Sequence, residues 1–245
     1  MRIVVIGATS AIAEHCCRLW VEREACDLVL VARDVAKAGR IAEDLRVRSA
    51  ASTVAVVGAD FLDTAAIGRL AAETAARPID IVLIAHGMLP EQQQAEGDLA
   101  LCRDTLEVNA LSPALFAEAF AGQFAKAGRG TIALIGSVAG DRGRKANYTY
   151  GASKGLVARY AEGLEHRFAG TSVSVVLIKP GPTDTPMAAS HRARGLRVAS
   201  VEQVARAMVR GIDAKRPVVY APAQWALIML VVRHLPRFIF NRLNL

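Results

Sequence analysis

Short apolar runs alternate along this chain with longer segments of helical composition. Residues 3–6 form a continuous run of β-branched side chains, the pattern of a parallel strand that is buried on both faces. Small residues at 7–13 follow at once and predict a tight turn into a helix. The strands predicted in this way lie at 2–6, 27–31, 53–57, 80–84, 130–135, 172–178 and 217–220.

The alternation of strands and helices extends from residue 2 to residue 220 and predicts an α/β fold, a single Rossmann-type doubly wound parallel sheet. Right-handed crossovers then place helices on both faces of the sheet. We expect residues 1–222 to form one dinucleotide-binding and catalytic domain, followed by a tail at 223–245. The helices include 65–76, 150–168, 201–212 and a longer one at 101–126, which Pro113 is expected to kink or interrupt.

The turn after the first strand is the expected nucleotide site, because ligands of such sheets bind beyond the carboxyl ends of the strands. Small residues let the backbone approach a pyrophosphate, and the next helix supplies amide donors at its N-terminus. The turn has a single glycine, so an ordinary tight turn is the competing interpretation. The residues expected to contact the cofactor here are Gly7, Thr9, Ser10, Ala11 and Ile12.

Residues after the second and third strands indicate which dinucleotide the site prefers. An acidic residue after the second strand commonly binds the ribose hydroxyls of NAD. Here Arg33 offers a guanidinium that suits a 2′-phosphate, and Asp34 would only partly offset it. The sequence therefore favours NADP(H) over NAD(H). Asp60, after the third strand, is a candidate partner for the adenine amino group, with capping of the next helix as its alternative role.

The strongest chemical signal is the segment Tyr-Gly-Ala-Ser-Lys at residues 150–154. Tyr150 and Lys154 share one helix face, and an ammonium beside a phenol lowers the pKa of the phenol. Tyr150 can then exchange a proton with an alcohol or carbonyl near neutral pH. Ser137, at the same sheet edge, can hydrogen-bond the carbonyl, and Asn109 is expected to hold a water that links it to Lys154.

With this combination of residues the chain resembles the short-chain dehydrogenase/reductase family from about residue 2 to residue 222. The resemblance implies that Asn109, Ser137, Tyr150 and Lys154 form the catalytic tetrad. Tyr150 would be the acid/base, and Lys154 would lower its pKa and bind the nicotinamide ribose. The implied cofactor is a nicotinamide dinucleotide, and the implied assembly is a homodimer or homotetramer.

The resemblance assigns further cofactor contacts to loops at the same sheet edge. Residues 180–185 read Pro-Gly-Pro-Thr-Asp-Thr and match the family's proline–glycine loop, which cradles the nicotinamide and its phosphate. Thr183 would contact the carboxamide and Thr185 the pyrophosphate side. The residues expected at the cofactor from these loops are Phe61, Ala85, His86, Gly87, Pro180, Gly181, Thr183 and Thr185.

Two departures from the family pattern affect the cofactor site. Ala11 and Ala13 replace two glycines of the first turn, so we expect binding with a slightly shifted pyrophosphate. The family's Asn-Asn-Ala-Gly stretch is here Ile-Ala-His-Gly at residues 84–87, which keeps Gly87 and loses the stabilising Asn. His86 either lies near the nicotinamide ribose or is a structural histidine of the loop.

Two segments bear on the substrate. In the family, residues corresponding to 186–199 form a substrate lid. Its Arg192, Arg194 and Arg197 suit a phosphate, a carboxylate or an acidic carrier protein, or form a solvated basic loop. The tail has an apolar run at 225–232, too short to span a bilayer, followed by mixed apolar and basic residues. It would lie on a membrane surface, pack on a partner subunit or cover the substrate pocket.

The tail and residues 139–142 also look similar to a reductase subfamily of bacterial cell-wall synthesis that acts on decaprenylphosphoryl-2-keto-erythro-pentose. That similarity implies a lipid-linked keto-sugar as the substrate. One alternative is a reductase of acyl-carrier 3-oxo thioesters. Another is a catalytically inactive, nucleotide-sensing or membrane-associated protein of the same fold.

Charge and cysteine usage narrow the partners. The net charge of +7 and the pI near 9.6 fit a phosphate-bearing ligand or an anionic surface. Nucleic acid is not expected, because no basic stripe is interleaved with aromatic residues. The four cysteines contain no CxxC pair, so no metal site is expected. Reduced thiols predict a cytoplasmic protein, at most peripheral at the cytoplasmic face of a membrane.

Overall fold

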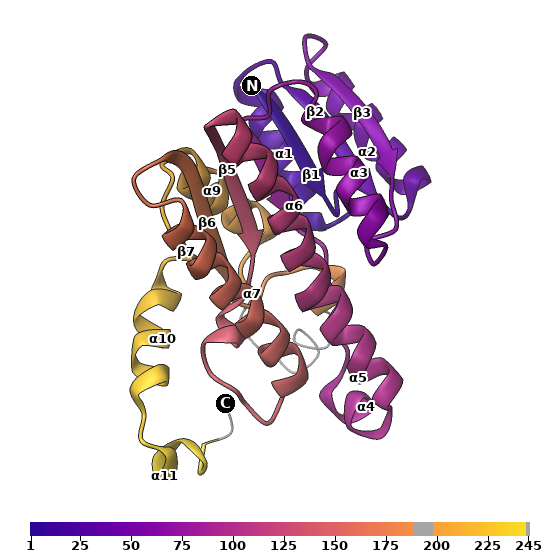
Figure 1. The fold of residues 1–245 in the computed structure, drawn as a ribbon. Coiled ribbons are helices and arrows are strands. Elements are labelled where there is room, and N and C mark those ends of the chain that lie inside the picture. Colours follow the sequence, from indigo (N-terminus) through magenta and orange to yellow (C-terminus); the bar gives the residue numbers. More distant parts are fainter. Residues whose placement is uncertain (189–197, 244–245) are drawn as a thin grey trace.

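The computed structural model describes residues 1–188 and 198–243, which contain a seven-stranded parallel sheet (Figure 1). Its strands are β1 (Arg2–Ile6), β2 (Asp27–Ala32), β3 (Thr53–Gly58), β4 (Ile81–Ile84), β5 (Arg129–Ile135), β6 (Ser172–Pro180) and β7 (Val218–Ala221). The strand order is β3-β2-β1-β4-β5-β6-β7, and every neighbouring pair is parallel. The order switches between β1 and β4, where doubly wound sheets bind their ligands. The predicted fold class is confirmed.

Helices connect the strands and complete the chain. They are α1 (Ala11–Arg23), α2 (Val35–Arg48), α3 (Thr64–Thr74), α4 (Gln92–Gly97), α5 (Leu99–Leu106), η1 (Glu107–Leu111), α6 (Ser112–Ala127), η2 (Val138–Asp141), α7 (Tyr148–Arg167), η3 (Pro186–Ala188), α9 (Val201–Asp213), α10 (Gln224–His234) and α11 (Arg237–Phe240). The helical segment predicted over 101–126 is interrupted near Pro113, as expected: the π-helical turn η1 lies between α5 and α6. Pro113 lies in the first turn of α6, directly after this π-helical turn.

Side chains of the central strands alternate between two apolar layers. On one face Ile3 and Val5 pack with residues of α1, α2 and α9. On the other face Val4 and Ile6 pack with residues of α3, α6 and α7. Helices cover both faces (Figure 1), so the strands are buried on both sides, which explains their continuous apolar runs.

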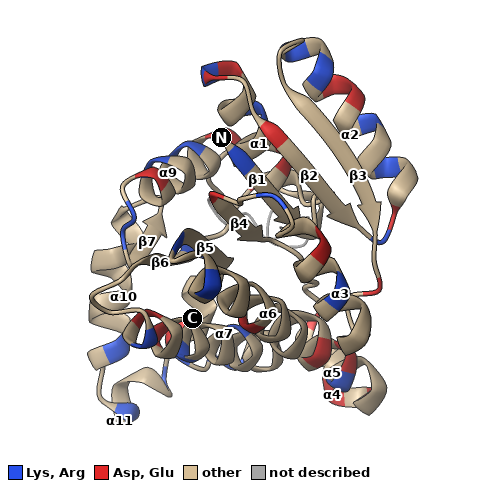
Figure 2. Cartoon of the chain, turned by 45° about the horizontal axis from the view of Figure 1, so that its top comes forward, with Lys and Arg blue, Asp and Glu red and all other residues tan. Residues whose placement is uncertain are grey.

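Charged side chains lie mainly on the outer surfaces of the helices. Acidic and basic residues are interspersed along α2 (Figure 2). Arg48 of this helix pairs with Asp44 one turn away and with Glu22 of α1. Such exposed pairs contribute little to stability but fix which helix faces point outward.

The tail forms α10, which follows β7, and α11, which lies beyond the far end of α10 (Figure 1). Arg142, directly after η2, donates from one guanidinium nitrogen to the carbonyl oxygens of Val232 and Leu235, each at 2.6 Å. The same guanidinium lies 3.7 Å from the ring centroid of Phe240. Arg142 therefore holds the C-terminal end of α10, where a cation also complements the helix dipole.

Candidate active site

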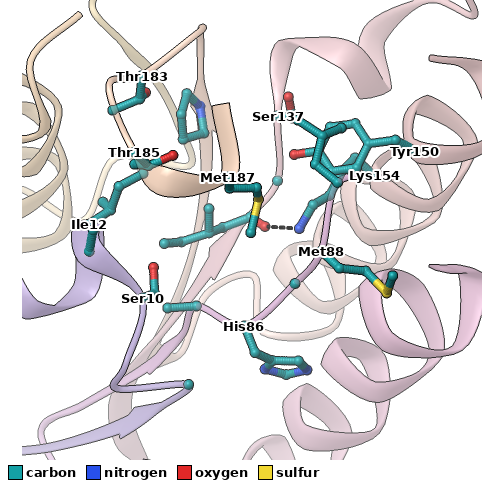
Figure 3. A pocket seen from close by; sticks show the side chains of 18 of the residues that line it. Ser10, Ile12, His86, Met88, Ser137, Tyr150, Lys154, Thr183, Thr185 and Met187 are labelled. Carbon is teal, nitrogen blue, oxygen red and sulfur yellow. Dashed lines mark hydrogen bonds between the residues drawn. The ribbon is translucent and has the colours of Figure 1, made fainter. Parts of the chain in front are cut away.

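A cavity of about 970 Å³ lies at the carboxyl ends of the central strands (Figure 3). Most residues that the sequence predicts for cofactor and catalysis meet there, whereas Asn109 and Asp60 are not part of its lining. The predicted residues that line it are Gly7, Thr9, Ser10, Ala11, Ile12, Arg33, Phe61, Ala85, His86, Gly87, Ser137, Tyr150, Lys154, Pro180, Gly181, Thr183 and Thr185.

The turn between β1 and α1 brings backbone close to the cavity. Gly7 has a φ of +81°, and a Cβ built on it would lie 2.6 Å from the backbone nitrogen of His86. Only glycine fits this position on both grounds. Ser10 is the N-cap of α1, but its side chain makes no capping hydrogen bond. The first amides of α1 are therefore not capped by this side chain and suit an anionic ligand.

A second cation accompanies Arg33 at the end of β2. Lys37, in the first turn of α2, lines the same part of the cavity. Neither cation has an ion-pair partner within the described chain. Asp34 also lines the cavity, but its carboxylate caps α2 by accepting from the backbone nitrogen of Lys37 at 2.8 Å. Arg33 and Lys37 therefore outnumber the Asp34 carboxylate, which accepts from the backbone of α2.

Asp60 does not cap α3, the alternative role expected for it, and its contact with the adenine amino group stays a prediction. Its carboxylate accepts from the backbone nitrogen of Leu62 at 2.9 Å and lies outside the cavity lining. The N-cap of α3 is Asp63, whose carboxylate accepts from two backbone amides. The sequence alone could not show which of these two acidic residues, three positions apart in one loop, caps α3.

His86 is a buried packing residue of the loop after β4. Its Nε2 lies 2.8 Å from Ser112 Oγ, which donates to the carbonyl oxygen of Phe61, so Nε2 is the donor. The ring packs edge-on against Phe61 and Phe116 and is directed away from Tyr150 (Figure 3). Burial lowers the pKa of His86 to about 3, with help from Lys154 and Arg33. A neutral structural histidine, one of the two predicted alternatives, fits these contacts.

Tyr150 lies in the first turn of α7 and faces the cavity with Ser137 (Figure 3). Burial raises the pKa of Tyr150 above its ordinary value, and a hydrogen bond with the Ser137 side chain opposes this rise. Ser137 Oγ also accepts from the backbone nitrogen of Ala139 at 3.1 Å, which fixes its orientation. The predicted lowering of the phenol's pKa is therefore wrong for the protein alone.

Lys154 lies near the Tyr150 ring and is hydrogen-bonded to the backbone of β5. Its ammonium donates to the carbonyl oxygen of Ile135 at 3.0 Å and is 5.9 Å from the ring centroid of Tyr150. Burial lowers the pKa of Lys154 from 10.5 to about 8. Tyr150 and Lys154 lie on one wall of the cavity, and both are desolvated there. The spacing of two residues on a helix does not predict how deeply they are buried.

Asn109 lies in the π-helical turn and clamps the loop after β4. Its Oδ1 accepts from the backbone nitrogen of Met88 and its Nδ2 donates to the carbonyl oxygen of Met88, both at 2.7 Å. A Cβ on Gly87 would lie 2.8 Å from Asn109 Oδ1 and 3.5 Å from Lys154 Nζ. The amide thus lies near Lys154, but it bonds to the Met88 backbone and so fixes the loop that carries Gly87.

The proline–glycine loop packs under the tail. A Cβ on Gly181 would lie 2.0 Å from Nε1 of Trp225, so the indole rests directly on the glycine. Trp225 also lines the cavity. Thr183 donates from its hydroxyl to the carbonyl oxygen of Gly181 at 2.9 Å. The first turn of α10 is therefore part of the cavity wall.

A family model described as short chain dehydrogenase matches residues 1–195, about four fifths of the chain. The chain belongs to the short-chain dehydrogenase family. The family assignment and the oxidoreductase names of its relatives make it an NAD(P)-dependent oxidoreductase.

Relatives of this short-chain dehydrogenase cover most or nearly all of its length. It is 32% identical to an uncharacterized oxidoreductase of Mycobacterium tuberculosis, with 98% of this chain and 96% of the relative covered. It is 31% identical to a galactitol 2-dehydrogenase (L-tagatose-forming) of Cereibacter sphaeroides, with 78% and 74% covered. Both names describe enzymes of oxidation and reduction.

Solved structures of short-chain dehydrogenases have the same fold. One from Sphingobium yanoikuyae in complex with NADPH has a TM-score of 0.78 at 26% identity, with 97% of each chain covered. One from Burkholderia cenocepacia J2315 in complex with NADP has a TM-score of 0.83 at 22% identity, with 100% of this chain and 97% of that chain covered. The second likeness concerns the fold alone.

Several cavity residues of this short-chain dehydrogenase were not predicted. Lys37 follows Arg33 by one helical turn, and that spacing was an available signal. Two more, Met187 and Trp225, lie in the predicted lid and tail, where no single residue was predicted to line the cavity. Others lie in segments without a motif, and they include Met88, Leu89, Arg144 and Asn147.

Other expectations concern the lid, metals and membrane spans. The lid arginines Arg192, Arg194 and Arg197 lie outside the described residues. Among residues 1–188 and 198–243, no cluster of His, Cys, Asp and Glu is arranged to hold a metal ion. Within the same ranges, every helix is too short or too polar to cross a bilayer.

Proposed function

We propose that this protein is an NADP(H)-dependent reductase of ketones that also oxidises the corresponding secondary alcohols. The observation that carries the proposal is the convergence of Ser137, Tyr150 and Lys154 on one wall of the cavity. Tyr150 donates its phenolic proton to the carbonyl oxygen, and Ser137 donates a hydrogen bond to the same oxygen. The nicotinamide, when bound, supplies the hydride to the carbonyl carbon.

The pKa values of the two ionisable groups favour reduction near neutral pH. The raised pKa of Tyr150 keeps the phenol protonated, which is the form that donates a proton. Below pH about 8, Lys154 is an ammonium and stabilises the phenolate that remains after the transfer. Asn109 acts as a positioning residue, because it fixes the loop that carries Gly87 beside Lys154.

The cavity fits a nicotinamide dinucleotide along its length. Gly7 lets the first turn lie directly against the backbone of His86, and the N-terminus of α1 would hold the pyrophosphate. Arg33 and Lys37 would bind a 2′-phosphate, which supports NADP(H) over NAD(H). The side chains and backbone expected to complete the site are Thr9, Ser10, Ala11, Ile12, Phe61, Ala85, His86, Gly87, Pro180, Gly181, Thr183 and Thr185.

Replacing Tyr150 with Phe tests the reaction. NADPH oxidation is measured with a panel of ketones, and NADPH binding is measured by the change in its fluorescence. We expect Tyr150→Phe to lower turnover at least about 100-fold while binding is retained. Tyr148→Phe is the matched control, because Tyr148 lies on the same helix, is 47% exposed and is outside the cavity. Equal turnover by the two variants would contradict the proposal.

Cofactor choice is tested with Arg33→Ala and Lys37→Ala. Each loses a cation that faces the 2′-phosphate, so the ratio of NADPH to NADH affinity should fall about tenfold or more. Affinity for NADH should change little. Arg40→Ala is a control, because Arg40 is exposed on α2 and does not line the cavity. An unchanged ratio of NADPH to NADH affinity in both variants would show that Arg33 and Lys37 do not determine the cofactor preference.

The substrate end favours a ketone with an extended apolar part. Met88, Leu89, Met187 and Trp225 line the cavity. These side chains support a lipid-linked keto-sugar as the substrate. A reductase of acyl-carrier 3-oxo thioesters is the second candidate, and an acidic carrier would dock on the basic lid. Turnover of acetoacetyl-carrier thioester above that of the free ketone acetoacetate would favour the second candidate.

We propose that α10 and α11 also contact an anionic membrane surface. Leu227, Leu230 and Phe238 are 68%, 55% and 67% exposed, and Arg237 and Arg242 lie among the apolar residues. This mixture complements anionic headgroups over an apolar layer. Flotation with phosphatidylglycerol vesicles should recover the protein, and a variant with Ser at the three exposed apolar positions should not float. Concentration-dependent self-association without flotation would instead identify a dimer contact.

A further inference from the structure

The segment between η2 and α7 places two buried polar atoms without partners beside the cavity. Arg144 Nε and Asn147 Oδ1 are both buried, and neither makes a hydrogen bond within the described chain. Both residues line the cavity. Unpaired buried polar atoms are costly, so they mark a place where a ligand supplies the missing partners.

Arg144 also has no counter-charge. No carboxylate among residues 1–188 and 198–243 pairs with its guanidinium, although the surface arginines Arg18 and Arg48 each have two. Burial lowers the pKa of Arg144 from its ordinary value, because the charged form loses part of its hydration. An unpaired, partly desolvated guanidinium is the side chain that most strongly attracts an oxyanion.

Contacts on both sides fix the position of this segment. Before it, the Asp141 carboxylate pairs with Lys179 at 2.6 Å and accepts from the Tyr220 hydroxyl at 2.7 Å. After it, the backbone nitrogen of Thr149 donates to Gln92 Oε1 at 3.0 Å, and Gln92 Nε2 donates to Thr149 Oγ1 at 3.2 Å. These contacts fix the backbone of the segment at Asp141 and at Thr149, on either side of Arg144.

Arg144 lies on a different segment from the two cations that would bind the nucleotide's 2′-phosphate. The cations for a 2′-phosphate are Arg33 and Lys37, at the end of β2. Arg144 instead precedes Tyr150 by six residues, on the segment that leads into α7. Asn147 is the N-cap of that helix, yet its side chain makes no capping hydrogen bond. Both groups are thus placed with the proton donor, at the substrate end.

We propose that Arg144 and Asn147 form an oxyanion subsite for the substrate. Arg144 binds a phosphate or carboxylate of the ketone, and Asn147 Oδ1 accepts a hydrogen bond from a hydroxyl group of the same molecule. The substrate class is therefore an anionic, hydroxyl-bearing ketone. This inference rests on the proposed ketone reduction and adds the charge that the substrate carries.

Two pairs of ketones distinguish a phosphate from a carboxylate as the anion that Arg144 binds. Hydroxyacetone phosphate is compared with hydroxyacetone, and 4-oxopentanoate is compared with 2-pentanone. For one pair at least, kcat/KM with NADPH should be about tenfold or more higher for the anionic member. Arg144→Gln should reduce that preference to nearly one and change kcat/KM for the neutral member less than about threefold. Arg144→Lys should restore part of the preference.

The matched control is Lys145→Gln. It removes a positive charge from the neighbouring position, but Lys145 is exposed and does not line the cavity. It should leave the preference unchanged. Equal effects of Arg144→Gln and Lys145→Gln, or a parent protein without preference in either pair, would overturn the subsite.

A binding measurement keeps the subsite testable without turnover. Inorganic phosphate is titrated calorimetrically into the protein saturated with NADP⁺, which occupies the nucleotide phosphate sites. Phosphate should bind the parent and Lys145→Gln, and binding should be lost in Arg144→Gln. Equal binding by the parent and Arg144→Gln would refute the subsite. Absence of reduction with any ketone would refute the proposed function and leave this measurement to decide the subsite.

Discussion

Replacing Lys179 with Met should lower the free energy of unfolding more than any surface substitution does, because a buried carboxylate loses its counter-charge. The Lys179 ammonium lies 2.6 Å from Asp141 Oδ1, and the two side chains are 7% and 3% exposed. The Tyr220 hydroxyl donates to the other carboxylate oxygen. These contacts join the segment after Ser137 to β6 and β7. Lys179→Met leaves Asp141 with one neutral donor.

The size of the effect follows from the burial of both partners. Removing one member of a buried ion pair costs about 3–5 kcal/mol, because the remaining charge stays desolvated. In a chain of this length each kcal/mol lowers Tm by about 2–4 °C, so Tm should fall by about 6–20 °C. The double variant Asp141→Asn/Lys179→Met carries no charge at the site, and Asn can still accept from Tyr220. It should be more stable than Lys179→Met alone.

Urea unfolding followed by circular dichroism at pH 7 gives the free energies of unfolding, and thermal scans give Tm. Arg206→Met is the matched control, because it breaks an exposed pair with Glu202 and should leave the unfolding midpoint nearly unchanged. The reasoning is refuted if Lys179→Met is no more destabilising than Arg206→Met. It is also refuted if the double variant loses as much stability as the two single variants together.

Two further predictions concern the cavity itself. Gly181→Ala should lower NADPH affinity about tenfold or more, because the new Cβ would meet the Trp225 indole. Adding Trp225→Ala should restore binding, and fluorescence titration of NADPH checks both results. Lys154→Met should abolish turnover yet raise Tm at pH 7, because it removes a desolvated ammonium whose pKa is lowered to about 8. Below pH about 8, Lys154 is charged in both the folded and the unfolded protein, so the folded protein carries the full cost of the buried charge. As pH rises from 8 towards 10.5, the folded protein loses this charge, and the gain in Tm from Lys154→Met should shrink. A gain in Tm that does not depend on pH would contradict the lowered pKa of Lys154.

Local patterns in the sequence were sufficient for the sheet and for part of the site. The continuous apolar runs predicted strands buried on both faces, and the two core layers explain why they do not alternate. Tyr150 and Lys154 could be placed on one wall because helix geometry fixes residues four apart. Gly7 could be placed at the nucleotide because a turn must follow the first strand.

The rest of the site depends on contacts between distant segments. Trp225 rests on Gly181, and Asn109 clamps Met88, although nothing near either residue in the sequence signals the partner. The direction of the pKa shift of Tyr150 was mispredicted for the same reason. The spacing of Tyr150 and Lys154 predicted a positive charge near the phenol. Only the packed structure shows how strongly the phenol is desolvated.

The measurement that tests the central claim most directly is deuteride transfer. Parent protein and Tyr150→Phe are incubated with C4-deuterated NADPH and the ketone panel, and the products are analysed by mass spectrometry. The account predicts deuterium at the carbinol carbon with the parent and at least about 100-fold less product with Tyr150→Phe, which still binds NADPH. Equal incorporation by both proteins, or none by a parent that binds NADPH, would contradict it.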